Sequence, residues 1–185
     1  MKTKTLDLYK LDSKDPKIKY GFAKELIKIG KSDPKLLYEY FDFWTNLITS
    51  DKNIIKWTAI DILGYISPVD KANRLPGQIE NLFKLLHSGN LITCNHAVFA
   101  LGLIAKNIPT QRTRIIKELV TISGDTFDTE ECRAIATGKV IETIKHFPGE
   151  IVDNQDVLEF IKKAQSSQRN ATKKKADSLM IKLIK

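Results

Sequence analysis

The sequence has few of the features that mark a secreted, membrane-spanning or metal-binding protein. It contains only two cysteines, Cys94 and Cys132, with no CxxC pair and no Cys–His metal spacing. No apolar run approaches the roughly 18 residues that a transmembrane helix needs, and residues 1–10 lack the apolar core of a signal peptide. Because two cysteines without a secretion signal indicate reduced thiols, we expect an intracellular, cytoplasmic protein.

Sequence motifs of catalytic and cofactor sites are missing as well. There is no GxSxG, HExxH or phosphate-binding glycine loop, and His87, His96 and His146 share no ligand spacing. The acidic loop 125–131 lacks the spacing and the glycine of a calcium site. The sequence therefore predicts no cofactor, no metal site and no enzymatic activity.

The net charge of +8 is spread unevenly along the chain. Residues 1–35 have a net charge of +5 and residues 162–185 of +7, whereas residues 36–161 have −4. A uniform surface for binding polyanions is therefore not indicated.

Turn-forming residues divide the chain into helical segments, and no β-type alternation persists. Four glycines follow apolar-periodic segments and are predicted to end helices in a left-handed conformation: Gly30, Gly89, Gly124 and Gly149. Four aspartates are predicted to cap helix starts: Asp15, Asp33, Asp128 and Asp153. Prolines end three further segments: Pro68, Pro109 and Pro148.

One apolar helical pattern recurs five times at intervals of 37 to 40 residues. Its clearest copy has a core face of Ile55, Ala59, Ile62/Leu63 and Ile66. The other copies begin at Ile18, Thr93, Cys132 and Thr172. The fifth position is small in four copies: Ala59, Ala97, Ala136 and Ala176. An apolar segment before each copy, such as the face from Leu36 to Ile48, supplies a partner helix, and such hairpins bury their apolar faces by stacking.

The segment Ile55-Lys56-x-x-Ala59-x-x-x-Leu63-Gly64-x-Ile66 resembles the second helix of a HEAT repeat, and Cys94-x-x-Ala97-x-x-x-Leu101-Gly102-x-Ile104 is similar. The resemblance implies an all-α fold, a right-handed α-α superhelix of the armadillo/HEAT solenoid kind. It also implies second helices that line a concave face and a scaffold role in protein binding. We expect a single domain of about five hairpins with approximate bounds 1–30, 31–68, 69–108, 109–148 and 149–185.

Two sets of residues are candidates for binding on that face. The position after the first core residue is basic in four copies and forms a ladder: Lys19, Lys56, Arg133 and Lys173. The ladder suits an acidic peptide or a phosphate backbone, or else each base pairs with an acid of the preceding turn. The aromatic residues Tyr20, Trp57 and Phe99 lie off the core face and are either anchors for a partner or packing between second helices.

The sequence leaves two classes of function open. The first is a non-enzymatic scaffold that binds a protein or peptide on the concave face. The second is a nucleic-acid-binding protein, because Trp57 and Asp61 are similar to the aromatic and aspartate arrangement of HEAT-like alkylpurine DNA glycosylases. The lysine-rich stretch 168–175 is either a basic binding helix or a solvated cap of the array.

Overall fold

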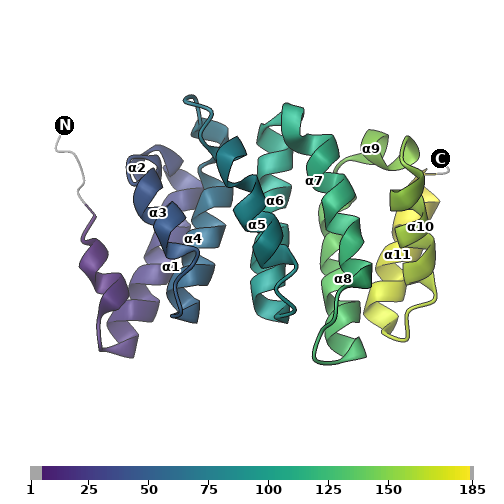
Figure 1. Cartoon of the computed structure of the whole chain (residues 1–185), viewed down its shortest axis with the longest axis horizontal. Helices are drawn as coiled ribbons and strands as arrows, with labels where there is room; N and C mark the ends of the chain where they lie inside the picture. Colours follow the sequence, from purple (N-terminus) through teal and green to yellow (C-terminus); the bar gives the residue numbers. More distant parts are fainter. Residues whose placement is uncertain (1–5, 184–185) are drawn as a thin grey trace. The chain divides into compact units, whose positions relative to one another are not determined.

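The protein is built from helices and connecting turns. The structure, a computed structural model, describes residues 6–183, and no β-strand occurs within that range. The chain forms two compact units, of which unit 1 ends at Gln78 and unit 2 begins at Ile79. Unit 1 is coloured purple to blue in Figure 1, and unit 2 teal to yellow.

Unit 1 contains two hairpins. Its elements, with 3-10 helices written η, are η1 (Leu8–Asp12), α1 (Pro16–Ser32), α2 (Pro34–Tyr38), α3 (Phe41–Leu47), α4 (Asn53–Tyr65), η2 (Ser67–Val69) and η3 (Leu75–Gln78). Helix α1 packs against η1 and α4, and α3 packs against α4. The buried Trp44 ties α3 to α2, because its indole Nε1 donates a 2.8 Å hydrogen bond to the carbonyl of Leu37.

Unit 2 contains three hairpins. Its elements are α5 (Ile79–Leu86), α6 (Leu91–Asn107), α7 (Pro109–Thr121), η4 (Ile122–Gly124), α8 (Glu130–Ile144), α9 (Pro148–Val152), α10 (Gln155–Gln165) and α11 (Asn170–Leu183). We call α5, α7 and α10 the first helices of unit 2, and α6, α8 and α11 its second helices (Figure 1). The second helices form a continuous layer, since α8 packs against both α6 and α11.

The small residues of the repeated pattern lie in the core, as the sequence predicts. Ala59, Ala97, Ala136 and Ala176 are all buried, and so are the larger core residues around Ala59 and Ala97. In the fourth and fifth copies Cys132, Met180 and Leu183, predicted in the core, are only half-buried. The second helices of unit 2 approach closely at two glycines. A Cβ at Gly102 would lie 2.5 Å from Cγ2 of Thr143, and one at Gly138 would lie 2.9 Å from Oγ1 of Thr172. Small residues therefore permit the tight second-helix layer.

Several local predictions are wrong. Ile18, predicted in the core, is 46% exposed near the start of α1. Among the described glycines only Gly89 has a left-handed φ, of 73°, while Gly30 and Gly149 lie inside helices and Gly124 ends η4. Sequence periodicity places a residue on a helix face, but it does not show whether a neighbouring element covers that face or where the helix ends.

Helix caps are predicted correctly in one case and shifted by one residue in two. Asp15 caps α1, because its carboxylate accepts a 2.8 Å hydrogen bond from the backbone N–H of Lys17. The caps of α8 and α10 are Thr129 and Asn154 rather than the preceding aspartates. At Asp33 the side chain makes no capping hydrogen bond.

The apolar face from Leu36 to Ile48, predicted as one helix, is divided. Helix α2 ends at Tyr38 and α3 starts at Phe41, with Tyr40 at the N-cap of α3. This division lets Trp44 point back to the carbonyl of Leu37.

The predicted fold class, an all-α array of stacked helical hairpins, is confirmed by the packing of hairpins within each unit. The assignment of these hairpins to the HEAT family stays a prediction. The bounds of the five repeats stay a prediction. Among the described residues, no helix has both the length and the apolar character needed to cross a membrane.

Candidate partner-binding surface

The second helices of unit 2 carry a stripe of residues on the side opposite their buried face. On α6 the buried positions include Ala97, Leu101 and Ile104. Phe99 and Lys106 lie about half a turn away from these positions, where they line grooves rather than the core. On α8 and α11, which pack side by side with α6 in the same layer, further residues line grooves in the same way.

A groove of about 550 Å³ lies between α6 and α8, and we call it the α6–α8 groove. Its lining is Phe99, Gly102, Leu103 and Lys106 from α6 and Lys139, Glu142, Thr143, Lys145, His146 and Phe147 from α8 and the turn after it. The ammonium group of Lys139 lies 5.9 Å from the centre of the Phe99 ring, at the limit of a cation–π contact. Three lysines therefore surround an apolar floor.

A second groove of about 220 Å³, the α8–α11 groove, lies beside the first. It is lined by Ile141, Glu142, Lys145, Lys174, Lys175, Ser178, Leu179 and Lys182. Glu142 and Lys145 belong to both grooves. Nζ of Lys175 forms an ion pair of 3.2 Å with Oε1 of Glu142, which places this acid between the two basic sets.

Four of the residues predicted to bind lie in unit 1. Tyr20 on α1 is 49% exposed, while Lys19, Lys56 and Trp57 are half-buried. The hydrogen bond and the charge of Lys52 lower the pKa of Asp12, and the charge of Lys19 adds a smaller effect in the same direction. Trp57 and Asp61 are both half-buried on α4. Burial raises the pKa of Tyr65, one turn further along α4, and the charge of Asp61 adds to this effect.

The other three predicted residues lie in unit 2 but do not share one site. Phe99 lines the α6–α8 groove. Arg133 lines a different cleft, described next, and Lys173 is exposed on α11. The ladder of bases and the aromatic anchors therefore remain predictions, and the structure joins only Phe99 to the lysine-lined grooves.

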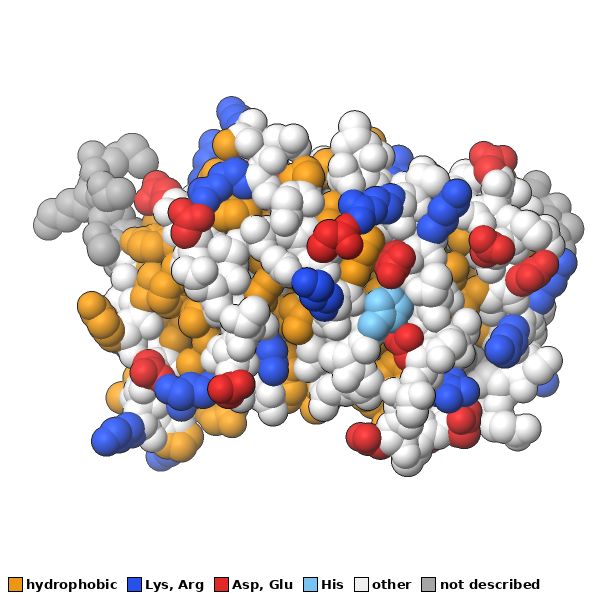
Figure 2. All heavy atoms as spheres, viewed as in Figure 1, with side chains coloured by type: hydrophobic (Ala, Val, Ile, Leu, Met, Phe, Trp, Pro, Cys, Tyr) orange, Lys and Arg blue, Asp and Glu red, His pale blue; other side chains and the backbone are white. Residues whose placement is uncertain are grey.

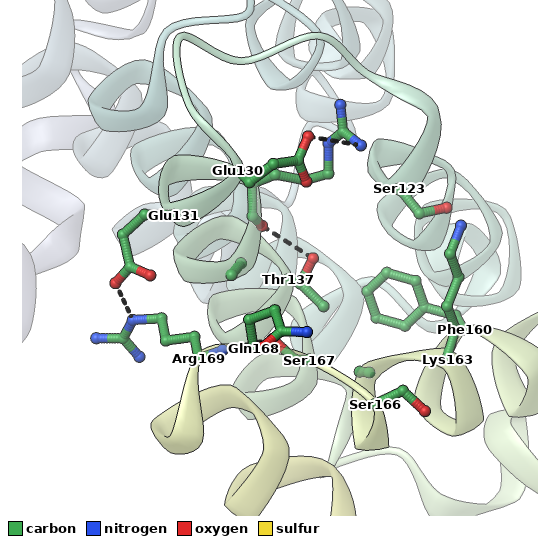
Figure 3. A pocket seen from close by; sticks show the side chains of 13 residues that line it. Ser123, Glu130, Glu131, Thr137, Phe160, Lys163, Ser166, Ser167, Gln168 and Arg169 are labelled. Atoms are coloured by element: carbon green, nitrogen blue, oxygen red, sulfur yellow. Dashed lines mark hydrogen bonds and ion pairs between the residues drawn. The ribbon is translucent and has the colours of Figure 1, made fainter.

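The cleft at Arg133 has a volume of about 410 Å³ and lies between the N-terminal part of α8 and the segment from α10 to α11. Arg133 pairs with Glu130 at 3.4 Å, and Nε of Arg169 donates a 2.8 Å hydrogen bond to Glu131. Figure 3 shows the second pair together at one edge of the cleft, with Lys163 at the opposite edge. Since two of the three bases are paired with acids, this cleft has little net charge to offer a ligand.

One cluster of titratable groups is visible only in the structure, because no sequence motif marks it. His87 lies between two acids, with Nδ1 2.8 Å from Oδ2 of Asp125 and Nε2 3.0 Å from Oε1 of Glu118. His87 is 38 residues from Asp125 and 31 from Glu118 in sequence, so no spacing motif reveals the cluster. The cluster ties the end of α5 to α7 and to the loop before α8, which is a structural role. Burial, with a smaller effect of the Asp125 charge, raises the pKa of the nearby Cys94 thiol to about 12.

The surface of unit 2 that faces the viewer in Figure 2 has a different character from the two grooves. Acidic and basic side chains alternate over it, and neither sign gathers into a patch. The gathering of lysines in the α6–α8 and α8–α11 grooves is therefore not a general property of the surface of unit 2.

No family model and no curated protein sequence matches this chain. Among solved structures, the chain is similar to a designed armadillo repeat protein with 16% sequence identity and a TM-score of 0.40. The match covers 95% of this chain and 98% of the designed protein.

Proposed function

We propose that the chain is a non-enzymatic binding module of the HEAT-repeat kind. It holds a protein partner on the exposed side of its second helices, which the HEAT resemblance makes the concave face, and it acts in the cytoplasm. The observation that carries this proposal is the pair of adjoining grooves across α6, α8 and α11. Both have apolar floors and cationic rims, a combination suited to holding side chains of a partner. Tyr20 and Trp57 are the proposed anchors in unit 1.

The experiment compares three tagged versions of the full chain as baits in the cells that naturally make it. They are the wild type, a groove variant and a matched control. The groove variant is Phe99→Ala with Ser178→Tyr, which removes the aromatic floor of one groove and fills the other. The control is Lys117→Ala with Lys162→Tyr, at exposed positions of the first helices α7 and α10.

The proposal predicts proteins that the wild type and the control retain equally and the groove variant retains about tenfold less, equivalent to about 1.4 kcal/mol. Retention is measured by quantitative mass spectrometry, with circular dichroism to check that each variant keeps its helices. The same proteins on all three baits, or none above background, contradicts the proposal.

Nucleic acid is the second candidate partner, because six lysines line the two grooves. The predicted ladder of Lys19, Lys56, Arg133 and Lys173 is a further set of candidate contacts for a phosphate backbone. Binding to nucleic acid falls steeply with salt, which separates this candidate from the first. A glycosylase activity at Trp57 and Asp61 would leave abasic sites in alkylated duplex DNA, so incubation with such DNA tests it.

A further inference from the structure

The two grooves concentrate positive charge on one side of unit 2. Their combined lining contains six lysines and one carboxylate, Glu142, which gives a net charge of +5 with histidine neutral. The lysines are Lys106, Lys139, Lys145, Lys174, Lys175 and Lys182. In sequence, three of them come from the acidic central region of the chain. Folding therefore creates a basic patch that the charge profile along the chain does not show.

Most of this charge is not neutralised within the described part of the chain. Glu142 pairs with Lys175, and Lys139 lies over the Phe99 ring. The other four lysines make no ion pair with residues 6–183, and all four are exposed. Gathering like charges costs free energy, so the patch needs a reason.

Helix dipoles explain only part of the patch. Lys106 and Lys182 lie in the last turns of α6 and α11, and Lys145 is the C-cap of α8, where cations interact favourably with the helix dipole. Lys174 and Lys175 lie in the first half of α11, where the dipole gives no such benefit. An anionic ligand that crosses the three helices accounts for all of these positions.

We infer that the α6–α8 and α8–α11 grooves bind an acidic polypeptide segment whose acidic side chains alternate with apolar ones, an assignment that rests on the proposed function. The lysine rims pair with its carboxylates. The floors receive its apolar side chains: Phe99, Leu103 and Phe147 in the first groove, Ile141 and Leu179 in the second. Three helices packed about 10 Å apart span about 20 Å, which is the length of about six extended residues.

The lining favours polypeptide over nucleic acid. It contains no arginine, the residue best suited to bidentate phosphate contacts. Successive bases stack on several aromatic side chains in typical single-strand sites. Here Phe99 and Phe147 are the only phenylalanine, tyrosine or tryptophan side chains in the lining of the two grooves, and both lie in the α6–α8 groove, so the three helices offer no row of stacking surfaces.

The test measures fluorescence anisotropy of labelled probes with the full chain at about 50 mM salt, where surface charges are weakly screened. The probe is a peptide of three copies of Glu-Leu-Asp-Ser, and its neutral counterpart has Gln and Asn in place of the acids. An oligothymidylate of similar length is the nucleic-acid arm. For this binding test the groove variant is a different one, the triple charge reversal Lys145→Glu, Lys174→Glu and Lys182→Glu. Its control has the same charge change on the first helices, Lys84→Glu, Lys117→Glu and Lys162→Glu.

The acidic peptide is expected to bind at least about tenfold more tightly than the neutral one, and the groove variant to lose about tenfold or more. The control variant is expected to stay within about twofold of the wild type. A milder variant with glutamine at the same three groove positions should lose an intermediate amount, which guards against misfolding of the triple glutamate variant.

Three results would overturn the inference: no binding of the acidic peptide, equal loss in the groove and control variants, or tighter binding of oligothymidylate than of the acidic peptide. If the acidic peptide fails to bind while the bait with Phe99→Ala and Ser178→Tyr still loses proteins, the acidic assignment falls and the proposed function stands. If both fail, the proposed function falls as well.

Discussion

At the scale of single residues, the two cysteines have different surroundings although both lie on second helices. Cys94 is fully buried in α6, whereas Cys132 near the start of α8 is half-exposed. Burial raises the pKa of Cys94 to about 12, so near neutral pH it stays a protonated thiol and a poor nucleophile.

We therefore expect the native protein to react with iodoacetamide at one thiol per chain. Cys94 should react about three orders of magnitude more slowly than an ordinary thiol, because its thiolate is that much rarer. Mass spectrometry of the labelled peptides measures the two rates. Cys132→Ser should abolish the fast phase, and unfolding in urea should make both cysteines of the wild type reactive. Similar rates at both thiols of the native protein would contradict the burial of Cys94.

The same thiol makes stability depend on pH in the alkaline range. The unfolded thiol loses its proton near pH 9.0, whereas the folded thiol keeps it to about 12. Unfolding thus releases a proton between these values, and the free energy of unfolding falls as the pH rises through this window.

We expect Cys94→Ala to lose less stability than the wild type between about pH 8 and about pH 11, since the alanine has no proton to release. Urea unfolding at each pH measures this change. Tyr65, whose pKa is also raised by burial, contributes to both proteins and cancels in the comparison. Equal losses in the two proteins would show that Cys94 ionises normally in the folded state.

At the scale of elements, the close approach of α6 and α8 depends on Gly102. The methyl group of Thr143 lies where a side chain at Gly102 would be. The Thr143 hydroxyl donates a 3.2 Å hydrogen bond to the carbonyl of Lys139, which helps to hold that rotamer. Overpacking costs about 1–3 kcal/mol, against about 1 kcal/mol gained when alanine replaces glycine in a helix.

Gly102→Ala should therefore destabilise the wild type by about 1 kcal/mol. In a Thr143→Ser background the obstructing methyl group is gone, and the same change should stabilise by about 1 kcal/mol. Urea unfolding of the four proteins gives both differences. The same sign in both backgrounds would mean that α6 and α8 are further apart than the structure shows.

The core register of α6 is tested by a pair of arginine substitutions. Ala97→Arg should cost roughly 3 kcal/mol or more, because Ala97 is fully buried and arginine would overpack the core and bury a charge. Ile92→Arg on the same helix is the control, since Ile92 is 47% exposed and its replacement should change stability by about 0.5 kcal/mol or less. Thermal unfolding compares the two variants. An unchanged melting temperature for Ala97→Arg would contradict the register.

Elements were predictable where a pattern repeats and less so where it does not. The buried alanines follow from five copies of one spacing, and Asp15 follows from its place before Pro16. The caps at Thr129 and Asn154 were missed by one residue, because each has a neighbouring aspartate with similar capping ability. The break between α2 and α3 depends on the tertiary position of Trp44, which no local pattern encodes.

At the scale of the whole molecule, folding redistributes the charge of the chain. The sequence shows basic ends and an acidic middle, whereas unit 2 brings lysines from both regions to the same two grooves. A partial signal existed, since Lys106 and Lys145 are 39 residues apart, the same interval that separates the repeat copies at Thr93 and Cys132. Lys139 and Lys182 have no lysine at the corresponding position of a neighbouring repeat copy. The two grooves could therefore not be predicted from the sequence and were found only in the structure.

The central claim is that partners bind the second helices of unit 2 and not its first helices. Photo-crosslinking in the cells that make the protein tests it most directly, with benzoylphenylalanine placed singly at Phe99, Ser178, Lys117 or Lys162. We predict covalent adducts with a partner from Phe99 and Ser178 and none from the two first-helix positions. Adducts from Lys117 or Lys162 in place of the groove positions, or no adduct from either groove, would contradict the claim.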